Sequence, residues 1–248
     1  MNVIIPAKGF SSRVKRKNMR KICGLPLIAW SVIQAKAAKQ VDKVYVSTND
    51  DEIADTAAEF GALVLWRKYK ETPDDSGAVP VYHAMEEIPK EDAVMMLLCT
   101  SPLRYPGMID EMISLYNRTE GMNYLITLGS TKETVIKKRL DEIRFESVLV
   151  DKDFNYLVDD NSTTITDMDE HMREYEWRER GTGNMDTDID AAASKGDPGF
   201  KDKRVPCYFP VAPWLCFETD SEEELRVTEI LLEGMILRGR SWRDTYEK

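Results

Sequence analysis

Histidine is scarce in this chain: among its 248 residues only His83 and His171 occur. Two histidines give little support to a histidine-based metal site or to a Ser-His-Asp triad. Cysteine is scarce too, and the four residues stand far apart in the sequence without any CxxC pair: Cys23, Cys99, Cys207 and Cys216. This spacing argues against a zinc site, and in a cytoplasmic setting it argues against disulfides as well.

Long apolar runs are also missing. No stretch approaches the ~20 apolar residues that a membrane-spanning helix needs. The first six residues are too short for the apolar core of a signal peptide, about 7–15 residues, and they lack a basic segment. We therefore expect a cytoplasmic protein without a membrane partner. The formal net charge of −10 also disfavours general nucleic-acid binding, which needs a broad basic surface.

The chain does contain short, apolar, β-branched segments that alternate with helical patterns, and 42% of its residues are hydrophobic. This alternation is typical of βαβ units and predicts a doubly wound, mainly parallel sheet with helices on both faces. The expected strands are residues 2–7, 43–48, 62–67, 93–99 and 123–128. The expected helices are residues 26–39, 51–61, 76–88 and 106–118.

The pattern changes after the fifth expected strand. We interpret residues 147–160 as a polar hairpin and residues 161–204 as irregular. Both ranges fall within 135–204, which we interpret as a long excursion from one domain that spans 1–248. Residues 205–220 are strand-like and aromatic. A closing helix is expected over 221–239, where a serine followed three residues later by a glutamate forms a capping box.

Positive charge gathers directly after the first expected strand, where fourteen residues hold Lys8, Arg13, Lys15, Arg16, Lys17, Arg20 and Lys21. In doubly wound sheets, ligands bind outside the carboxyl ends of the strands. Cations, hydroxyls and backbone N–H groups in a turn suit a polyanion such as a nucleoside triphosphate. The loop is neither a P-loop nor a dinucleotide fingerprint, and a solvated basic loop is an equal alternative.

Four blocks of the chain, residues 4–32, 44–67, 100–104 and 218–233, are similar to the CMP-sialic acid synthetases, or N-acylneuraminate cytidylyltransferases. The first reads IIPAKGFSSRVKRKNMRKICGLPLIAWSV and the last ETDSEEELRVTEILLE. The resemblance implies a nucleotide-diphospho-sugar transferase-like fold. It also implies a reaction in which CTP and a sugar acid give a CMP-sugar and pyrophosphate.

The resemblance further implies which residues bind the nucleotide: Lys8, Gly9, Ser11, Ser12, Lys17, Asn18 and Arg67. Lys8 and Lys17 are catalytic candidates together with Asp220. Mg²⁺ is the implied cofactor, with Asp220 as its ligand and Glu218 in second place. As an alternative, acids near a helix start interact favourably with the helix dipole. A rival acidic cluster lies at 185–192.

The acceptor sugar is assigned by resemblance to Leu98, Thr100, Ser101 and Arg104. Leu98 stands where the family often has Gln. A leucine there cannot make the polar contacts that the glutamine would make to the sugar. The stretch lacks the acidic Gly-Asp-x-Pro motif of the Kdo cytidylyltransferases, so the sialic-acid type is closer. A structural role for Arg104 is an equal alternative. For Arg67 the alternative is a surface charge at a strand end, and His83 is expected to be a packed helix histidine.

Two other classes of function remain open: a nucleotidyltransferase with another base or acceptor, and a catalytically silent relative that binds a nucleotide or a protein. The silent relative remains open because the chain departs from the family at three positions: Lys instead of Arg at position 8, Leu instead of Gln at position 98, and Glu instead of Asp at position 218. The resemblance also implies a homodimer in which part of 135–204 reaches the partner. The expected anchors there are Phe154, Tyr156, Tyr175 and Trp177.

Overall fold

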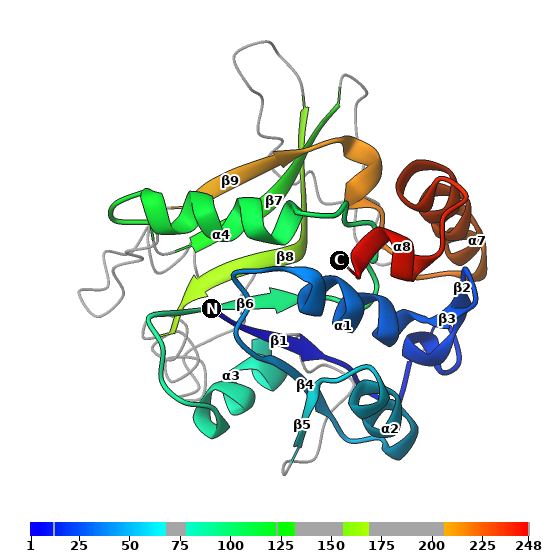
Figure 1. The fold of residues 1–248 in the computed structure, drawn as a ribbon, viewed down its shortest axis with the longest axis horizontal. Coiled ribbons are helices and arrows are strands. Elements are labelled where there is room, and N and C mark those ends of the chain that lie inside the picture. The colour runs from blue at the N-terminus through cyan, green and yellow to red at the C-terminus, as the bar shows by residue number, and fades with distance from the viewer. Residues whose placement is uncertain (12, 68–77, 123, 132–155, 169–205, 248) are drawn as a thin grey trace, which may run out of the picture.

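The computed structural model describes residues 1–11, 13–67, 78–122, 124–131, 156–168 and 206–247. Within them, a large sheet has the strand order β5-β4-β1-β6-β8-β7-β9, and β2 and β3 form a small hairpin (Figure 1). The strands are β1 Asn2–Pro6, β2 Lys21–Ile22, β3 Leu25–Pro26, β4 Val44–Thr48, β5 Leu63–Trp66, β6 Ala93–Leu97, β7 Tyr124–Thr131, β8 Tyr156–Asp167 and β9 Pro206–Val211. No helix in the described ranges is long and apolar enough to cross a membrane.

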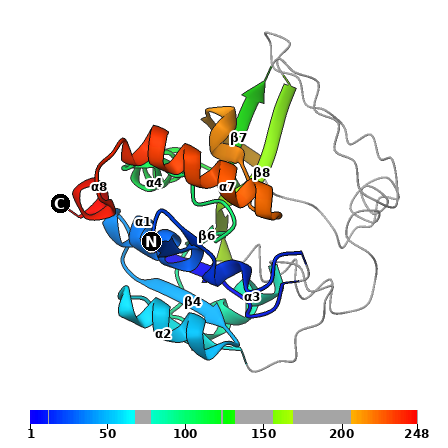
Figure 2. The same ribbon diagram turned by 90° about the vertical axis from the view of Figure 1, so that its right-hand side faces the viewer.

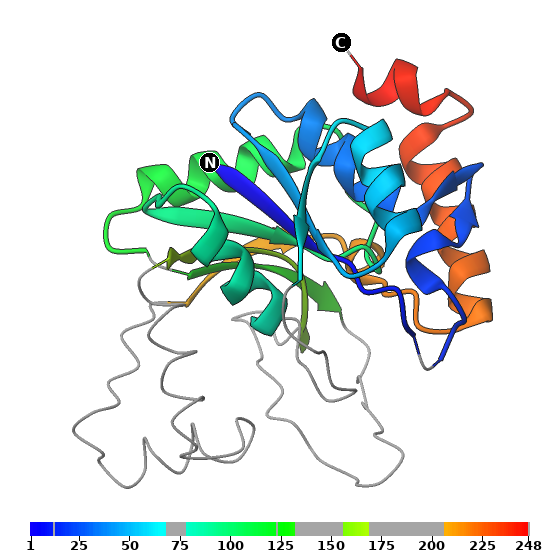
Figure 3. The same cartoon turned by 90° about the horizontal axis from the view of Figure 1, so that it is seen from below.

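Helices cover both faces of the large sheet. They are α1 Leu27–Ala37, α2 Asp51–Glu59, α3 Ala78–Glu87, α4 Met108–Arg118, α7 Glu222–Leu231 and α8 Trp242–Tyr246, with short turns η1 Lys17–Met19, η2 Pro213–Cys216 and η3 Leu232–Leu237. Successive strand residues point to opposite faces. Val3 and Ile5 of β1 therefore pack with α1, α2 and α4, while Ile4 packs with α3 (Figure 3).

The first half of the chain folds as its hydrophobic pattern predicts. β1 pairs in parallel with β4 on one side and with β6 on the other, and β5 continues the sheet beyond β4. Every strand and helix expected up to residue 128 is present, with ends that differ by no more than three residues. The prediction of a doubly wound, mainly parallel sheet with helices on both faces is confirmed.

Helix α1 is covered on all sides. Every residue from Leu27 to Ala35 is buried, which is the expected place for a helix that is apolar all round. One side of α1 packs on the sheet, and the other packs against the C-terminal helices through Trp30, Leu225 and Tyr246. The C-terminal elements thus form a further layer over α1, with α7 beside β2 (Figure 1).

The irregular interpretation of residues 161–204 is wrong at its beginning. Residues 156–167 form β8, which lies antiparallel between β6 and β7 in the middle of the sheet. Its buried polar residues are Thr163, Thr164 and Thr166, whose β-branched side chains favour strands although they are polar. β8 also replaces the second half of the expected hairpin at 147–160, whose first residues lie outside the described ranges.

The C-terminal prediction holds in outline and is wrong in detail. The expected strand over 205–220 is shorter, because β9 ends at Val211 and is followed by the turn η2. The expected helix over 221–239 is α7, which continues as the π-helical turn η3 up to Leu237. The sequence pattern gave no indication of the short helix α8.

The parallel strands set the position of the candidate site. β5, β4, β1 and β6 end at the same edge of the sheet, which Figure 2 turns toward the viewer. The segments that follow these ends contain the basic loop, Asn49 and Asp50, Arg67, and residues 98–107. Helix α7 contacts β2, and the segment before α7 therefore lies at the same edge.

Candidate active site

The basic loop after β1 is folded back on itself. Asn18 is buried, and its Nδ2 donates a hydrogen bond to the carbonyl oxygen of Lys8 over 3.0 Å. The backbone N–H of Gly9 donates to Asn49 Oδ1 over 3.3 Å. Asn18 and Gly9 were both predicted to contact the nucleotide, and in the structure both make hydrogen bonds within the protein that shape the loop. A nucleotide role for them remains a prediction.

Two of the predicted catalytic residues meet beside this loop. Lys17 Nζ lies 2.6 Å from Asp220 Oδ1, although the two residues are 203 positions apart in the sequence. Arg13 pairs with the second carboxylate oxygen of Asp220. The side chains of Lys17 and Asp220 are 16% and 28% exposed, so the pair is largely shielded but still reachable from solvent. The structure therefore places a carboxylate among the cations that were expected to bind phosphates.

The start of α7 holds Asp220 in place. Ser221 caps the helix, because its Oγ accepts from the Glu224 N–H over 3.2 Å. Glu224 Oε2 in turn accepts from the Asp220 N–H over 2.8 Å, so the reciprocal bond of the capping box goes one residue further back than expected. The buried Thr219 donates from its N–H and its hydroxyl to the Thr100 carbonyl, over 2.8 and 2.9 Å.

That last contact brings the predicted acceptor segment beside the predicted metal ligand. Leu98 and Thr100 are half-buried at the end of β6. Ser101 is buried, and its hydroxyl finds no hydrogen-bond partner within the described residues. Glu218 is half-buried two residues before Asp220, with the buried Thr219 between them.

The other predicted nucleotide residues lie along the same edge. Lys8 and Ser11 are half-buried in the basic loop, whereas Ser12 lies outside the described residues. Arg67 is half-buried at the end of β5, where its Nε donates to Ser47 Oγ over 3.2 Å and its Nη2 to the Ser47 carbonyl over 2.9 Å. It is therefore anchored on β4 and is not a loose surface charge. The rival cluster at 185–192 falls outside the described ranges.

Arg104 is buried and hydrogen-bonded within the protein, and its acceptor role remains a prediction. Only 1% of the residue is exposed, and its guanidinium donates to Thr163 Oγ1 over 2.8 Å, Gln34 Oε1 over 3.1 Å and the Leu98 carbonyl over 3.0 Å. Tyr246 Oη donates to the Arg104 carbonyl over 2.6 Å. These contacts join α1, β8, α8 and the loop after β6. The structural interpretation of Arg104 is the one that the geometry supports.

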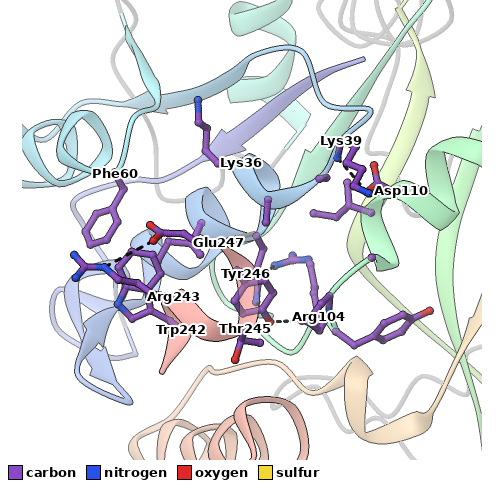
Figure 4. Close-up of a pocket in the computed structure, with 18 of the residues that line it drawn as sticks. Lys36, Lys39, Phe60, Arg104, Asp110, Trp242, Arg243, Thr245, Tyr246 and Glu247 are labelled. Carbon is purple, nitrogen blue, oxygen red and sulfur yellow. Dashed lines mark hydrogen bonds and ion pairs between the residues drawn. The ribbon is translucent and has the colours of Figure 1, made fainter. Parts of the chain in front are cut away.

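A pocket of about 1300 Å³ lies between α1, α8 and the start of α4, with the end of α2 at its rim (Figure 4). Arg104 and Tyr246 line it beside Lys36, Phe60 and Trp242. Apart from Arg104, none of the predicted site residues belongs to its wall. The pocket is thus separate from the edge where Lys17 and Asp220 meet.

Sequence reasoning missed one charged cluster at the site. Arg16 pairs with Asp50 and with Glu52, and its Nη2 lies 3.0 Å from Asp50 Oδ1. The hydrogen bonds from Arg16 hold the pKa of Asp50 below its usual range, against the opposing effect of burial. Asp50 directly precedes the expected helix 51–61, but nothing in the sequence indicated that it faces the basic loop.

His83 stays within α3, as expected. Its ring packs edge-on against Tyr82, and its Nδ1 lies 3.2 Å from Glu86 Oε2 one turn along the helix. It lines a small pocket of about 260 Å³ with Trp66 and Arg67. Contacts along its own helix account for this histidine.

Several known proteins are similar to this chain in sequence. The 8-amino-3,8-dideoxy-manno-octulosonate cytidylyltransferase of Shewanella frigidimarina is 32% identical over 160 residues, which are 63% of this chain and 63% of that protein. The CMP-N,N'-diacetyllegionaminic acid synthase of Legionella pneumophila is 31% identical over 123 residues, 47% of this chain and 53% of the other. N-acylneuraminate cytidylyltransferase B of Danio rerio is 31% identical over 126 residues, 50% and 29% of the two chains. The chain therefore matches less than two thirds of the length of these relatives.

Among solved structures, a CMP:2-keto-3-deoxy-manno-octonic acid synthetase complexed with CTP superposes with a TM-score of 0.67 over 94% of this chain and 98% of its own. At 16% sequence identity, this likeness shows the fold alone. The family model described as cytidylyltransferase matches residues 2–188, which is most of the chain. The protein belongs to the cytidylyltransferase family.

Proposed function

We propose that the protein transfers a cytidylyl group from CTP to a sialic-acid-like sugar acid, with release of pyrophosphate. The observation that carries the proposal is the meeting of Lys17 and Asp220 beside the folded basic loop. The names of the relatives include both octulosonate-type and sialic-type sugar acids. The sialic type remains our proposal, because no acidic Gly-Asp-x-Pro stretch follows β6.

The residues at the edge suit this chemistry. An acceptor hydroxyl attacks the α-phosphorus, and pyrophosphate leaves with its electron pair, so the protein must position the reactants and neutralise charge. Lys17 and Lys8 would neutralise the triphosphate, with help from Ser11 and Ser12. The Asp220 carboxylate pairs with Arg13 and Lys17, and Lys17 is one of the cations that the phosphate oxygens would contact.

Mg²⁺ is part of the proposal, and the residues present fit it. In nucleotide sites this ion is held by one or two carboxylates, with phosphate oxygens and water as its other ligands. The described residues contain no group of three or more His, Cys, Asp or Glu side chains arranged to hold a metal ion by themselves, but they do place Asp220 at the loop with Glu218 two residues away. When bound, the metal would neutralise charge that develops on the phosphates. Asp220 would hold it, with Glu218 in second place.

A ligand screen tests the function. Thermal shift with CTP, UTP, GTP and ATP, each with Mg²⁺, should show selective stabilisation by CTP. Pyrophosphate release should then require CTP together with a sialic-type or octulosonate-type sugar acid. Stabilisation by CTP without turnover on any sugar acid would indicate a silent relative. Stabilisation by another nucleotide would replace the donor in the proposal.

A further inference from the structure

Asp50 lies where two neighbouring strands end. Pro6 at the end of β1 pairs with Ser47 near the end of β4, and the Ala7 N–H donates to the Ser47 carbonyl over 2.9 Å. The loops after both strands therefore start side by side. Asp50 caps α2, because its Oδ1 accepts from the Ile53 N–H over 3.1 Å.

The same carboxylate faces the basic loop at two points. Both terminal guanidinium nitrogens of Arg16 pair with this carboxylate. The Arg16 side chain is 35% exposed and the Asp50 side chain is 17% exposed. Arg16 has a left-handed backbone, with φ of 55°, directly before the turn that carries Lys17. A residue other than glycine rarely holds this conformation unless surrounding contacts maintain it.

Gly9 is the second point. A Cβ atom at this position would clash with Asp50 Oδ2 and would lie 2.8 Å from Asp50 Cβ. The Gly9 N–H is also bonded to Asn49, the residue before Asp50. The beginning and the middle of the loop thus rest on one dipeptide at the end of β4.

We propose that Asp50 is a positioning residue. It holds the described parts of the basic loop, residues 8–11 and 13–20, in the shape that binds the triphosphate, because it pairs with Arg16 and packs closely against Gly9. The inference rests on the proposed function of that loop. Arg16 is itself neutralised by Asp50 and Glu52, so its charge serves the loop's shape. A loop held in its bound shape before the ligand arrives loses less conformational entropy on binding.

The test is Asp50→Asn. Asparagine caps helices as well as aspartate does, so the start of α2 should survive. The negative charge and the second acceptor oxygen that pair with Arg16 are lost. We expect the CTP dissociation constant to rise by about five-fold or more. In ligand-free protein, the backbone amides of residues 8–20 should exchange their hydrogens faster than in the wild type. The matched control is Glu52→Gln, which removes the more exposed partner of Arg16 and should change CTP affinity by less than about two-fold.

A double-mutant cycle with Arg16→Ala separates positioning from a direct contact. If Asp50 acts through Arg16, the double variant should bind CTP no more weakly than the weaker single variant. Additive losses, or a loss with Arg16→Ala but none with Asp50→Asn, would overturn the proposal and make Arg16 a phosphate ligand. Unchanged amide exchange in Asp50→Asn would also overturn it. Absence of CTP binding in the wild type would instead reject the proposed function, since the exchange experiment does not depend on the nucleotide.

Discussion

At the scale of single residues, the pair of Lys17 and Asp220 joins the two ends of the chain at one point. Lys17→Ala should weaken CTP binding by about 1.5–3 kcal/mol, because it deletes a charge-assisted contact to phosphate. Titration calorimetry with CTP measures this loss. Lys21→Ala, which removes an exposed lysine of the same basic segment, is the control and should leave the affinity nearly unchanged. Equal affinities of Lys17→Ala and the wild type would show that this loop does not hold the triphosphate.

Asp220→Asn should keep the fold and lose metal-dependent turnover, because the amide has nearly the same shape but no charge. The backbone bond from Asp220 to Glu224 and the cap at Ser221 do not depend on the carboxylate. Pyrophosphate release is measured with added Mg²⁺ and after chelation. Glu222→Gln, which disrupts only an exposed pair with Arg20, should behave as the wild type. Survival of both turnover and metal dependence would move the search to residues 185–192.

Arg104→Leu tests whether this arginine is structural. Its removal leaves buried acceptors on Thr163 and Gln34 without their donor, so we expect the free energy of unfolding to fall by at least about 2 kcal/mol. Urea denaturation followed by circular dichroism gives this value. Arg243→Leu removes an arginine whose side chain is 72% exposed and should cost much less. A variant of normal stability that fails only to bind the sugar acid would restore the acceptor assignment.

The sequence shows which residues are charged, but it does not show which residues those side chains contact. Lys17 and Asp220 were predicted from the basic run and from the family's acidic pair, and the structure brings them together. The partners of Arg16 were not predictable in this way, because nothing distinguishes one cation in a run of seven as the one that pairs with Asp50 and Glu52 at the start of α2. Arg104 shows the opposite case, since its motif resembles a ligand position while its burial makes it structural.

At the scale of elements, helix α7 connects stability to the site through its first turn. Ser221→Ala should destabilise the protein by about 1 kcal/mol, because Ser221 Oγ caps the Glu224 N–H. Ser221→Asp should restore the cap and the stability. Chemical denaturation of the three proteins checks this order. If alanine proves as stable as serine, the capping bond contributes nothing and another contact must fix the start of α7.

Elements were predictable where hydrophobicity and period agree. β1, β4, β5, β6 and the start of β7 are apolar, and the helices between them have clear ends, so their succession along the chain followed from the pattern. The hairpin of β2 and β3 was missed because each strand has only two residues. β8 was missed because its buried residues are threonines, which count as polar in a hydrophobic pattern although they suit a strand. α8 was missed because five residues are too few for a helical period to be seen.

At the scale of the whole molecule, the site is an outcome of topology. Parallel strands bring the ends of β1, β4, β5 and β6 to one edge, and the C-terminal layer over α1 returns Asp220 to it. General rules for open α/β sheets predict the edge. They do not predict which distant segment reaches it, because that depends on how α7 and α8 cover a helix that is apolar on all sides.

For the whole molecule we also propose that two chains assemble into a homodimer. β6 pairs with β8 only over Thr163–Asp167, and within the described chain the residues Tyr156–Asp159 pair with β7 alone. This part of β8 runs beyond the body of the sheet, and a strand edge of this kind favours pairing or cover. Tyr156, one of the four expected anchors, opens the extension, while the other three lie outside the described residues.

Light scattering at micromolar concentration should therefore give twice the mass of one chain. Dilution to the monomer should lower turnover if the partner helps to close the sugar site. The matching measurement is CTP binding at the same dilution, which should persist because the basic loop and Asp220 belong to one chain. A monomer with full activity at micromolar concentration would show that each chain builds its own sugar pocket and that the extension of β8 folds against its own subunit.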